Sequence, residues 1–207
     1  MTKITERGMI FNAEMVRAIL DGRKTQTRRP IKWKQTRFTE IGEREDGSKW
    51  PWSEDAEHAC DFWHPCPFGA VGDRIWVREA FRVHSRATDV ATLVYKASER
   101  NSWTEQTRRV PVAVCNKPAT PEKWIPSLHM PRWASRILLE ITGVRVERLR
   151  SMSQDDARAE GVIAASGPME AGLAFRELWD SIYGEENWNA NPWVWVIEFK
   201  RVEGGAA

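Results

Sequence analysis

The stretch Gly22-Arg23-Lys24-Thr25-Gln26-Thr27-Arg28-Arg29-Pro30 decides how this sequence is interpreted. It follows the segment 12–20, whose apolar residues recur at the spacing of an amphipathic helix that Gly22 is expected to end. Pro30 restricts the residue before it to extended backbone, so the stretch is expected to finish as an edge strand or an open loop. Four cations stand close together here, and their repulsion favours a lowered pKa for Lys24. A solvated charged segment after a helix is the simpler alternative.

Working outward, the chain alternates short strand-like and helix-like segments. Asn12 and Ser153 are expected N-caps, and Ser153 with Asp156 resembles a capping box. The segment 193–199 is apolar on both alternating faces until Glu198, which is typical of a strand buried on both sides. A helix from Pro168 is expected to turn five side chains to a core, namely Leu173, Phe175, Leu178, Trp179 and Ile182. Further strands are expected at 9–11, 74–79, 91–95, 136–141 and 144–146, the last two as a pair with a bend at Gly143.

Two stretches interrupt this alternation, at about 31–66 and 98–133. Between residues 40 and 61 there are eight acidic and two basic residues, whereas between 21 and 37 there are seven basic and one acidic. Weak apolar periodicity and many Gly, Ser and Pro residues indicate long loops. We therefore expect one domain, 1–207, of the α+β class: a small mixed β-barrel with flanking helices and two large loop insertions.

Composition excludes several classes of protein. The 207 residues are 42% hydrophobic and 29% charged with a formal net charge of +2, which is globular and argues against disorder. No apolar run approaches the length of a membrane span, and the first residues lack the apolar core of a signal peptide. Three cysteines, an odd number, favour reduced thiols in a cytoplasmic protein. We expect no membrane partner, and the oligomeric state is left open.

The pattern Gly22-x-Lys24-x-x-Thr27-x-Arg29 resembles the G-x-K-x-x-E-x-R signature of the ASCH domain, a PUA-like β-barrel fold linked with RNA. Thr27 stands where the family usually has Glu, as in its branch of small bacterial N4-acetylcytidine amidohydrolases. Three more segments resemble that branch in the same order: 72–77, 157–160 and 196–200. A fourth segment, 124–131, resembles phage and prophage ASCH proteins of about this length.

This resemblance implies a site and a reaction. Lys24 would be the catalytic base, Thr27 the nucleophile or its orienter, and Glu160 the proton shuttle. Arg23 and Arg29 would bind substrate, with Arg29 holding a nucleobase carbonyl or an oxyanion. The implied activity is hydrolysis of an acylated cytidine nucleoside or related base without a cofactor. Two alternatives remain: a non-catalytic module that binds RNA or modified nucleic acid, and an ASCH-type ribonuclease.

Other residues carry weaker signals. Trp33 lies among Lys32, Lys34 and Arg37, which suits stacking on a base beside phosphates of single-stranded RNA or DNA. His129, in a loop bounded by prolines, could line the site. Four side chains of the types that bind zinc lie within nine residues: His58, Cys60, His64 and Cys66. They could hold a structural zinc ion, and we call this possible site the zinc clip, although their spacing is tighter than in common zinc knuckles. A catalytic metal is not expected.

Overall fold

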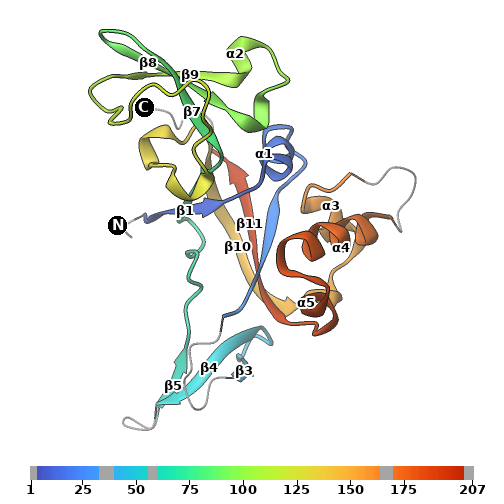
Figure 1. Cartoon of the computed structure of the whole chain (residues 1–207). Coiled ribbons are helices and arrows are strands. Elements are labelled where there is room, and N and C mark those ends of the chain that lie inside the picture. The colour runs from blue at the N-terminus through green and yellow to red at the C-terminus, as the bar shows by residue number, and fades with distance from the viewer. Residues whose placement is uncertain (1–3, 33–39, 56–59, 164–169, 203–207) are drawn as a thin grey trace. The chain divides into compact units, whose positions relative to one another are not determined.

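The computed structural model describes residues 4–32, 40–55, 60–163 and 170–202, and its fold is mixed α+β (Figure 1). The chain divides into two compact units, which are described separately. The first comprises Met1–Gly22, Asp73–Glu140 and Arg201–Ala207, and the second comprises Arg23–Gly72 and Ile141–Lys200. The single-domain boundaries expected from the sequence stay a prediction.

The first unit carries one parallel pair of strands and one antiparallel sheet. Strand β1 (Glu6–Ile10) runs parallel to β6 (Arg74–Arg78), and the first residues of β10 (Leu138–Arg148) pair antiparallel with β6. A separate sheet has the order β7 (Phe81–Arg86), β8 (Val90–Tyr95) and β9 (Thr107–Pro111). Helices α1 (Ala13–Leu20) and α2 (Trp103–Gln106) also belong to the first unit. Its β7–β9 core centres on the fully buried residues Phe81, Val83, Leu93 and Tyr95.

In its described residues, the second unit combines a sheet, three α-helices and an antiparallel hairpin sheet. The later part of β10 is followed in sheet order by β11 (Trp193–Arg201) and β2 (Gln26–Pro30). Helices α3 (Gln154–Ala159), α4 (Glu170–Tyr183) and α5 (Glu185–Asn189) follow β10 in the chain. The other sheet has the order β3 (Glu40–Glu43), β4 (Lys49–Asp55) and β5 (Cys60–Trp63). Val194 and Val196 of β11 pack with Phe175 and Trp179 of α4, so one face of β11 lies under this helix.

The expected α+β class is confirmed, but the described strands form open sheets and no closed barrel. Strand β2 stands at the end of its sheet order, as Pro30 predicts for an edge strand. Asn12 caps α1 by accepting a hydrogen bond from the Met15 N–H at 2.8 Å. Gly22 follows the helix with a φ of +75°, in the left-handed region that favours glycine. Ser153 and Asp156 form the expected capping box of α3.

The prediction that the two insertions are long loops is largely wrong. The first contains the β3–β4–β5 sheet, and the second contains α2, β9 and short 3-10 turns. These strands are stabilised by hydrogen bonds to partner strands, which local composition does not reveal. The expected strand pair around Gly143 is also wrong, because β10 runs without interruption from Leu138 to Arg148.

Helix α4 buries fewer apolar side chains than expected. Phe175 and Trp179 are buried, together with Ala171 one turn earlier. Leu173 and Ile182 are exposed, at 61% and 42%, so their expected place in the core is wrong. A helix that covers one face of a sheet buries a stripe of residues three to four apart, and Leu173 lies on the opposite side of the helix from that stripe. Ile182 lies on the same side as the stripe but in the last turn of α4, which ends at Tyr183. Among the helices that the structure describes, none has the length and apolar character needed to cross a bilayer.

Candidate active site

The candidate site is built on one face of strand β2. Residues two apart in an extended chain share a face, and Lys24, Gln26 and Arg28 follow that spacing. Lys24 precedes the strand and pairs with Glu160 through an isolated antiparallel bridge. Val196 of β11 lies opposite Arg28 and belongs to the core beneath α3 and α4. The three side chains therefore project toward the layer that contains α3.

The centre of the site is a buried ion pair between Lys24 and Glu160. The Lys24 Nζ donates to Glu160 Oε2 at 2.7 Å and to the Glu160 carbonyl oxygen at 2.9 Å. Exposed fractions are 0% for the Lys24 side chain and 2% for Glu160. Glu160 is the C-cap of α3. Because the capping box fixes where this short helix begins, it also fixes the position of the Glu160 carboxylate at the other end. The expected meeting of these two residues, 136 positions apart, is confirmed.

Arg28 adds a second buried cation to the same carboxylate. Its Nη1 donates to Glu160 Oε1 at 3.1 Å, and its Nη2 donates to Glu147 Oε1 at 2.5 Å. The Arg28 Nη2 also lies 3.4 Å from Asp156 Oδ1. Each oxygen of the Glu160 carboxylate thus has its own cation, and Arg28 links Glu160 to the two carboxylates nearby.

Arg145 of β10 closes the network on its outer side. It donates to Asp156 Oδ1 at 2.8 Å, to Glu147 Oε2 at 3.4 Å and to the carboxylate of Glu198. Gln26 Nε2 donates to the carbonyl oxygen and to Oδ1 of Asp156, at 2.9 and 3.1 Å. The network therefore alternates cations and anions from the buried Lys24 to the half-exposed Arg145.

Burial and neighbours shift the pKa values of these groups in different directions. Burial lowers the pKa of Lys24 below its ordinary value, and Glu160 offsets only part of this effect. Burial would also lower the pKa of Arg28, but Glu160, Glu147 and Asp156 outweigh it and raise the value. For Asp156, burial raises the pKa, whereas hydrogen bonds from Ser153 and Gln26 and the charge of Arg28 lower it overall. Lys24 is thus the cation of the network whose proton is most easily removed.

Thr27 does not join this group. Strand β2 is regular from Gln26 to Pro30, so Thr27 lies on the face opposite to Gln26 and Arg28. Its direct partner across the sheet is Ile197, and it is 1% exposed. Among the described residues, no hydrogen bond joins the Thr27 hydroxyl to Lys24 or Glu160. The structure brings together two members of the expected Lys24, Thr27 and Glu160 set.

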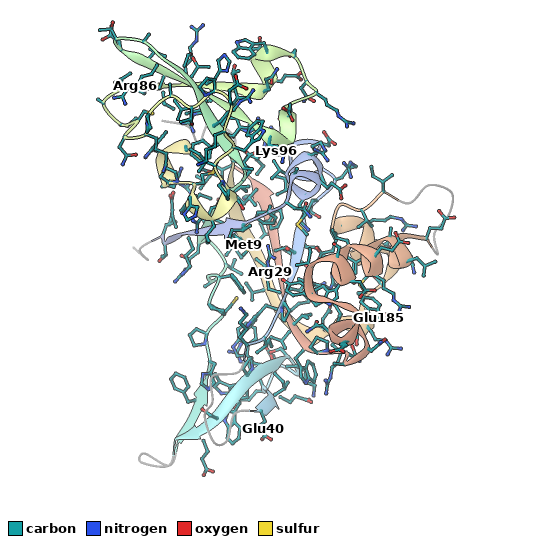
Figure 2. All side chains as sticks on the ribbon, viewed as in Figure 1. Met9, Arg29, Glu40, Arg86, Lys96 and Glu185 are labelled. Carbon is teal, nitrogen blue, oxygen red and sulfur yellow. The ribbon has the colours of Figure 1, made fainter. Side chains whose placement is uncertain are left out.

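The expected substrate-binding residues are dispersed. Arg23 is exposed, and its Nη1 donates to the carbonyl oxygen of Gly161 at 2.6 Å. Arg29, labelled on β2 in Figure 2, donates to the Tyr183 hydroxyl at 3.3 Å. His129 belongs to the first unit, where it ends an exposed 3-10 turn. Trp33 lies outside the described residues.

The expected zinc clip gains no support. His58 lies outside the described residues, as does the side chain of Cys60. His64 Nε2 lies 2.9 Å from the Ser53 hydroxyl, and the Cys66 side chain is buried. Across the described part of the chain, no three His, Cys, Asp or Glu residues are grouped as metal ligands.

Sequence reasoning misses most of the network around the central pair. It places Arg28 only in a cationic run and predicts no role in the site for Gln26, Arg145, Glu147 or Asp156. The alternation of Lys24, Gln26 and Arg28 along an edge strand could have indicated a shared face. Nothing local could indicate Glu147, which is 119 positions from Arg28.

Comparisons with protein families, with characterised proteins and with solved structures gave no match for this chain.

Proposed function

We propose that the protein is a hydrolase of the ASCH type. It would cleave the acyl-amide bond of an N4-acylated cytidine or a related modified nucleobase, with Lys24 and Glu160 as the proton-transfer pair. The observation that carries this proposal is the 2.7 Å contact between the Lys24 Nζ and the Glu160 carboxylate inside a covered site. The resemblance of the Lys24 and Glu160 segments to those of the amidohydrolase branch supports the same assignment.

The chemistry follows from the different proton affinities of the two groups. The base in this scheme is Glu160, whereas the family resemblance implies Lys24 for that role. The Glu160 carboxylate removes one proton from a water molecule, and the water oxygen attacks the acyl carbon. The bond to the exocyclic nitrogen breaks as Lys24 donates a proton to that nitrogen. Lys24 then recovers a proton from Glu160 across their hydrogen bond, which releases a carboxylic acid and a free amine. The lowered pKa of Lys24 favours this donation.

Water replaces Thr27 as the nucleophile in this scheme. The Thr27 side chain lies on the other face of β2 from Arg28, so it is not placed to exchange a proton with Glu160. Thr27→Val is therefore expected to keep most of the activity. A decrease in rate as large as that of Lys24→Met would show that the Thr27 hydroxyl takes part in the reaction.

The test is incubation of the protein with N4-acetylcytidine and related acylated nucleosides, with chromatographic detection of the free amine. Lys24→Met and Glu160→Gln should each reduce the rate by about 10²- to 10⁴-fold. Arg158→Gln is the matched control, because Arg158 lies on α3 but forms its ion pair with the exposed Asp155. Both catalytic side chains are covered, so the proposal also requires that substrate binding uncover them. Absence of product with the unaltered protein, or full activity in a folded Lys24→Met variant, would refute it.

One observation favours a second candidate, a non-catalytic ASCH module. Both oxygens of Glu160 are already bonded to cations, as expected for an ion pair that only supports the fold. This candidate predicts binding of RNA or modified nucleosides without turnover. Cleavage of labelled RNA that disappears in Lys24→Met would instead indicate a ribonuclease.

A further inference from the structure

The guanidinium of Arg28 is held from three sides within the second unit. Its Nη1 donates to Glu160 at the end of α3, at 3.1 Å, and its Nη2 donates to Glu147 of β10 at 2.5 Å. The ring centre of Phe175 on α4 lies 6.0 Å from its central carbon. The side chain is fully buried, and the surrounding carboxylates raise its pKa overall although burial opposes them. Arg28 is therefore a permanent cation with a fixed orientation.

Two cations of different kinds divide the Glu160 carboxylate between them. Its Oε1 accepts from Arg28, and its Oε2 accepts from the Lys24 Nζ at 2.7 Å. Each carboxylate oxygen has two acceptor positions, so both oxygens could still receive a proton. A proton on Oε1 would lie against a cation that never loses its charge, whereas a proton on Oε2 lies against a lysine that gives its own proton away. The proton that Glu160 takes up is therefore carried on Oε2.

We infer that Arg28 is a positioning residue of the candidate site. It acts through Glu160: by holding Oε1, it turns Oε2 toward Lys24 and directs proton transfer along the contact between these two groups. The ASCH signature leaves this position unspecified, because its arginine matches Arg29. Arg29, labelled in Figure 2, lies on the other face of β2. The kinetic part of this inference rests on the proposed function, but its electrostatic part can be measured without a substrate.

Arg28 also changes the electrostatic environment of Lys24. Burial lowers the pKa of Lys24, Glu160 raises it, and Arg29 and Arg28 lower it further. The other charged groups on this face of the sheet and on α3 contact Arg28 or one another: Glu147, Arg145, Asp156 and Glu198. The flanking cations Arg23 and Lys200 are exposed, so water screens them. Without the charge of Arg28, Lys24 should keep its proton to higher pH.

The first measurement follows the side-chain signals of Lys24 by NMR in protein with isotope-labelled lysine, as the pH is raised. These signals are identified by their absence from the spectrum of Lys24→Met. Arg28→Met should move the titration of Lys24 to higher pH, and Arg28→Lys, which keeps the charge, should move it less. The variant is expected to fold, because Glu160 keeps Lys24 while Glu147 and Asp156 are partly exposed, at 21% and 22%. An unchanged titration in Arg28→Met would overturn the inference.

The second measurement is the rate of amine release from N4-acetylcytidine per folded molecule. Arg28→Met should lower this rate about tenfold to a hundredfold with little change in KM, because Arg28 orients Glu160 and does not bind substrate. Arg28→Gln can still donate a hydrogen bond to Oε1, so it should retain more of the rate than Arg28→Met. A purely structural role would reduce the folded fraction and leave the rate per folded molecule unchanged, and that result would also overturn the inference.

Two control variants separate positioning from a general effect of charge. Arg158→Gln removes a cation of α3 whose partner is the exposed Asp155, and it should leave both measurements unchanged. Arg145→Gln removes a half-exposed cation of the same network, and it should shift the Lys24 titration less than Arg28→Met. Equal shifts in these two variants would contradict a specific role of Arg28. If the unaltered protein releases no amine but Arg28→Met shifts the titration as expected, the hydrolase fails and the coupling of Arg28 to the pair is supported.

Discussion

Each unit of the molecule contains a buried glutamate paired with a cation, and the two pairs differ in kind. In the second unit, the Lys24 Nζ lies 2.7 Å from Glu160 Oε2. In the first, Arg136 donates to both oxygens of Glu79, at 2.9 and 3.0 Å. Both glutamate side chains are 2% exposed.

The difference lies in what the cation can do. Arg136 also bonds the Ser98 hydroxyl at 2.9 Å, and its guanidinium lies 4.1 Å from the ring centre of Tyr95. An arginine stays protonated under all ordinary conditions, so this pair holds its geometry and moves no proton. A lysine can lose its proton, and burial lowers the pKa of Lys24. Similar burial thus supports a structural clamp in one unit and a candidate acid–base pair in the other.

The largest effect on stability is expected from Arg136→Met. This change leaves Glu79 buried, and burial already raises its pKa against the opposing effect of Arg136. An uncompensated buried charge costs about 3–5 kcal/mol, and denaturant unfolding measures it. The double variant Arg136→Met/Glu79→Leu should recover most of this stability. A decrease under about 1 kcal/mol in the single variant would show that the clamp is not structural.

Lys24→Met is expected to cost less stability, about 1–3 kcal/mol in the same measurement. The reason is that Glu160 keeps Arg28, whose Nη1 lies 3.1 Å from Oε1. The proposed activity should nevertheless fall sharply, whereas Arg136→Met should leave the rate per folded molecule unchanged. Equal decreases in stability in the two single variants would remove the distinction between the pairs.

The smallest effect concerns the half-exposed end of the network and appears as a pH dependence. The pKa of Asp156 is lower in the folded protein than in the unfolded chain, so its contribution is present at neutral pH and disappears as pH falls below the ordinary range of aspartate. Asp156→Asn should therefore reduce stability at pH 7 and flatten the decline on the acid side. Unfolding curves from about pH 7 to about pH 2 measure both effects. Glu45→Gln, an exposed acid of the second unit, is the control; an unchanged acid slope in Asp156→Asn would contradict the prediction.

Local signals in the sequence predicted those elements that depend on neighbouring residues. The caps at Asn12 and Ser153 involve hydrogen bonds across three residues, so their sequence patterns carry nearly all the information. The strand 193–199 was recognisable because both of its faces are apolar. The hairpin sheet β3–β5 was not, since its acidic residues and glycines obscure the alternation that hydrogen bonding across strands imposes.

The sequence by itself determined where α1, α3 and β11 lie and indicated, through a family resemblance, that Lys24 and Glu160 belong together. Only the tertiary structure decided that Arg28 shares the Glu160 carboxylate and that Thr27 lies on the opposite face of β2. The physical reason is the distance along the sequence over which each kind of interaction acts. Caps and amphipathic periods act over three to seven residues, whereas the network joins side chains more than one hundred positions apart through strand register, which no local pattern encodes.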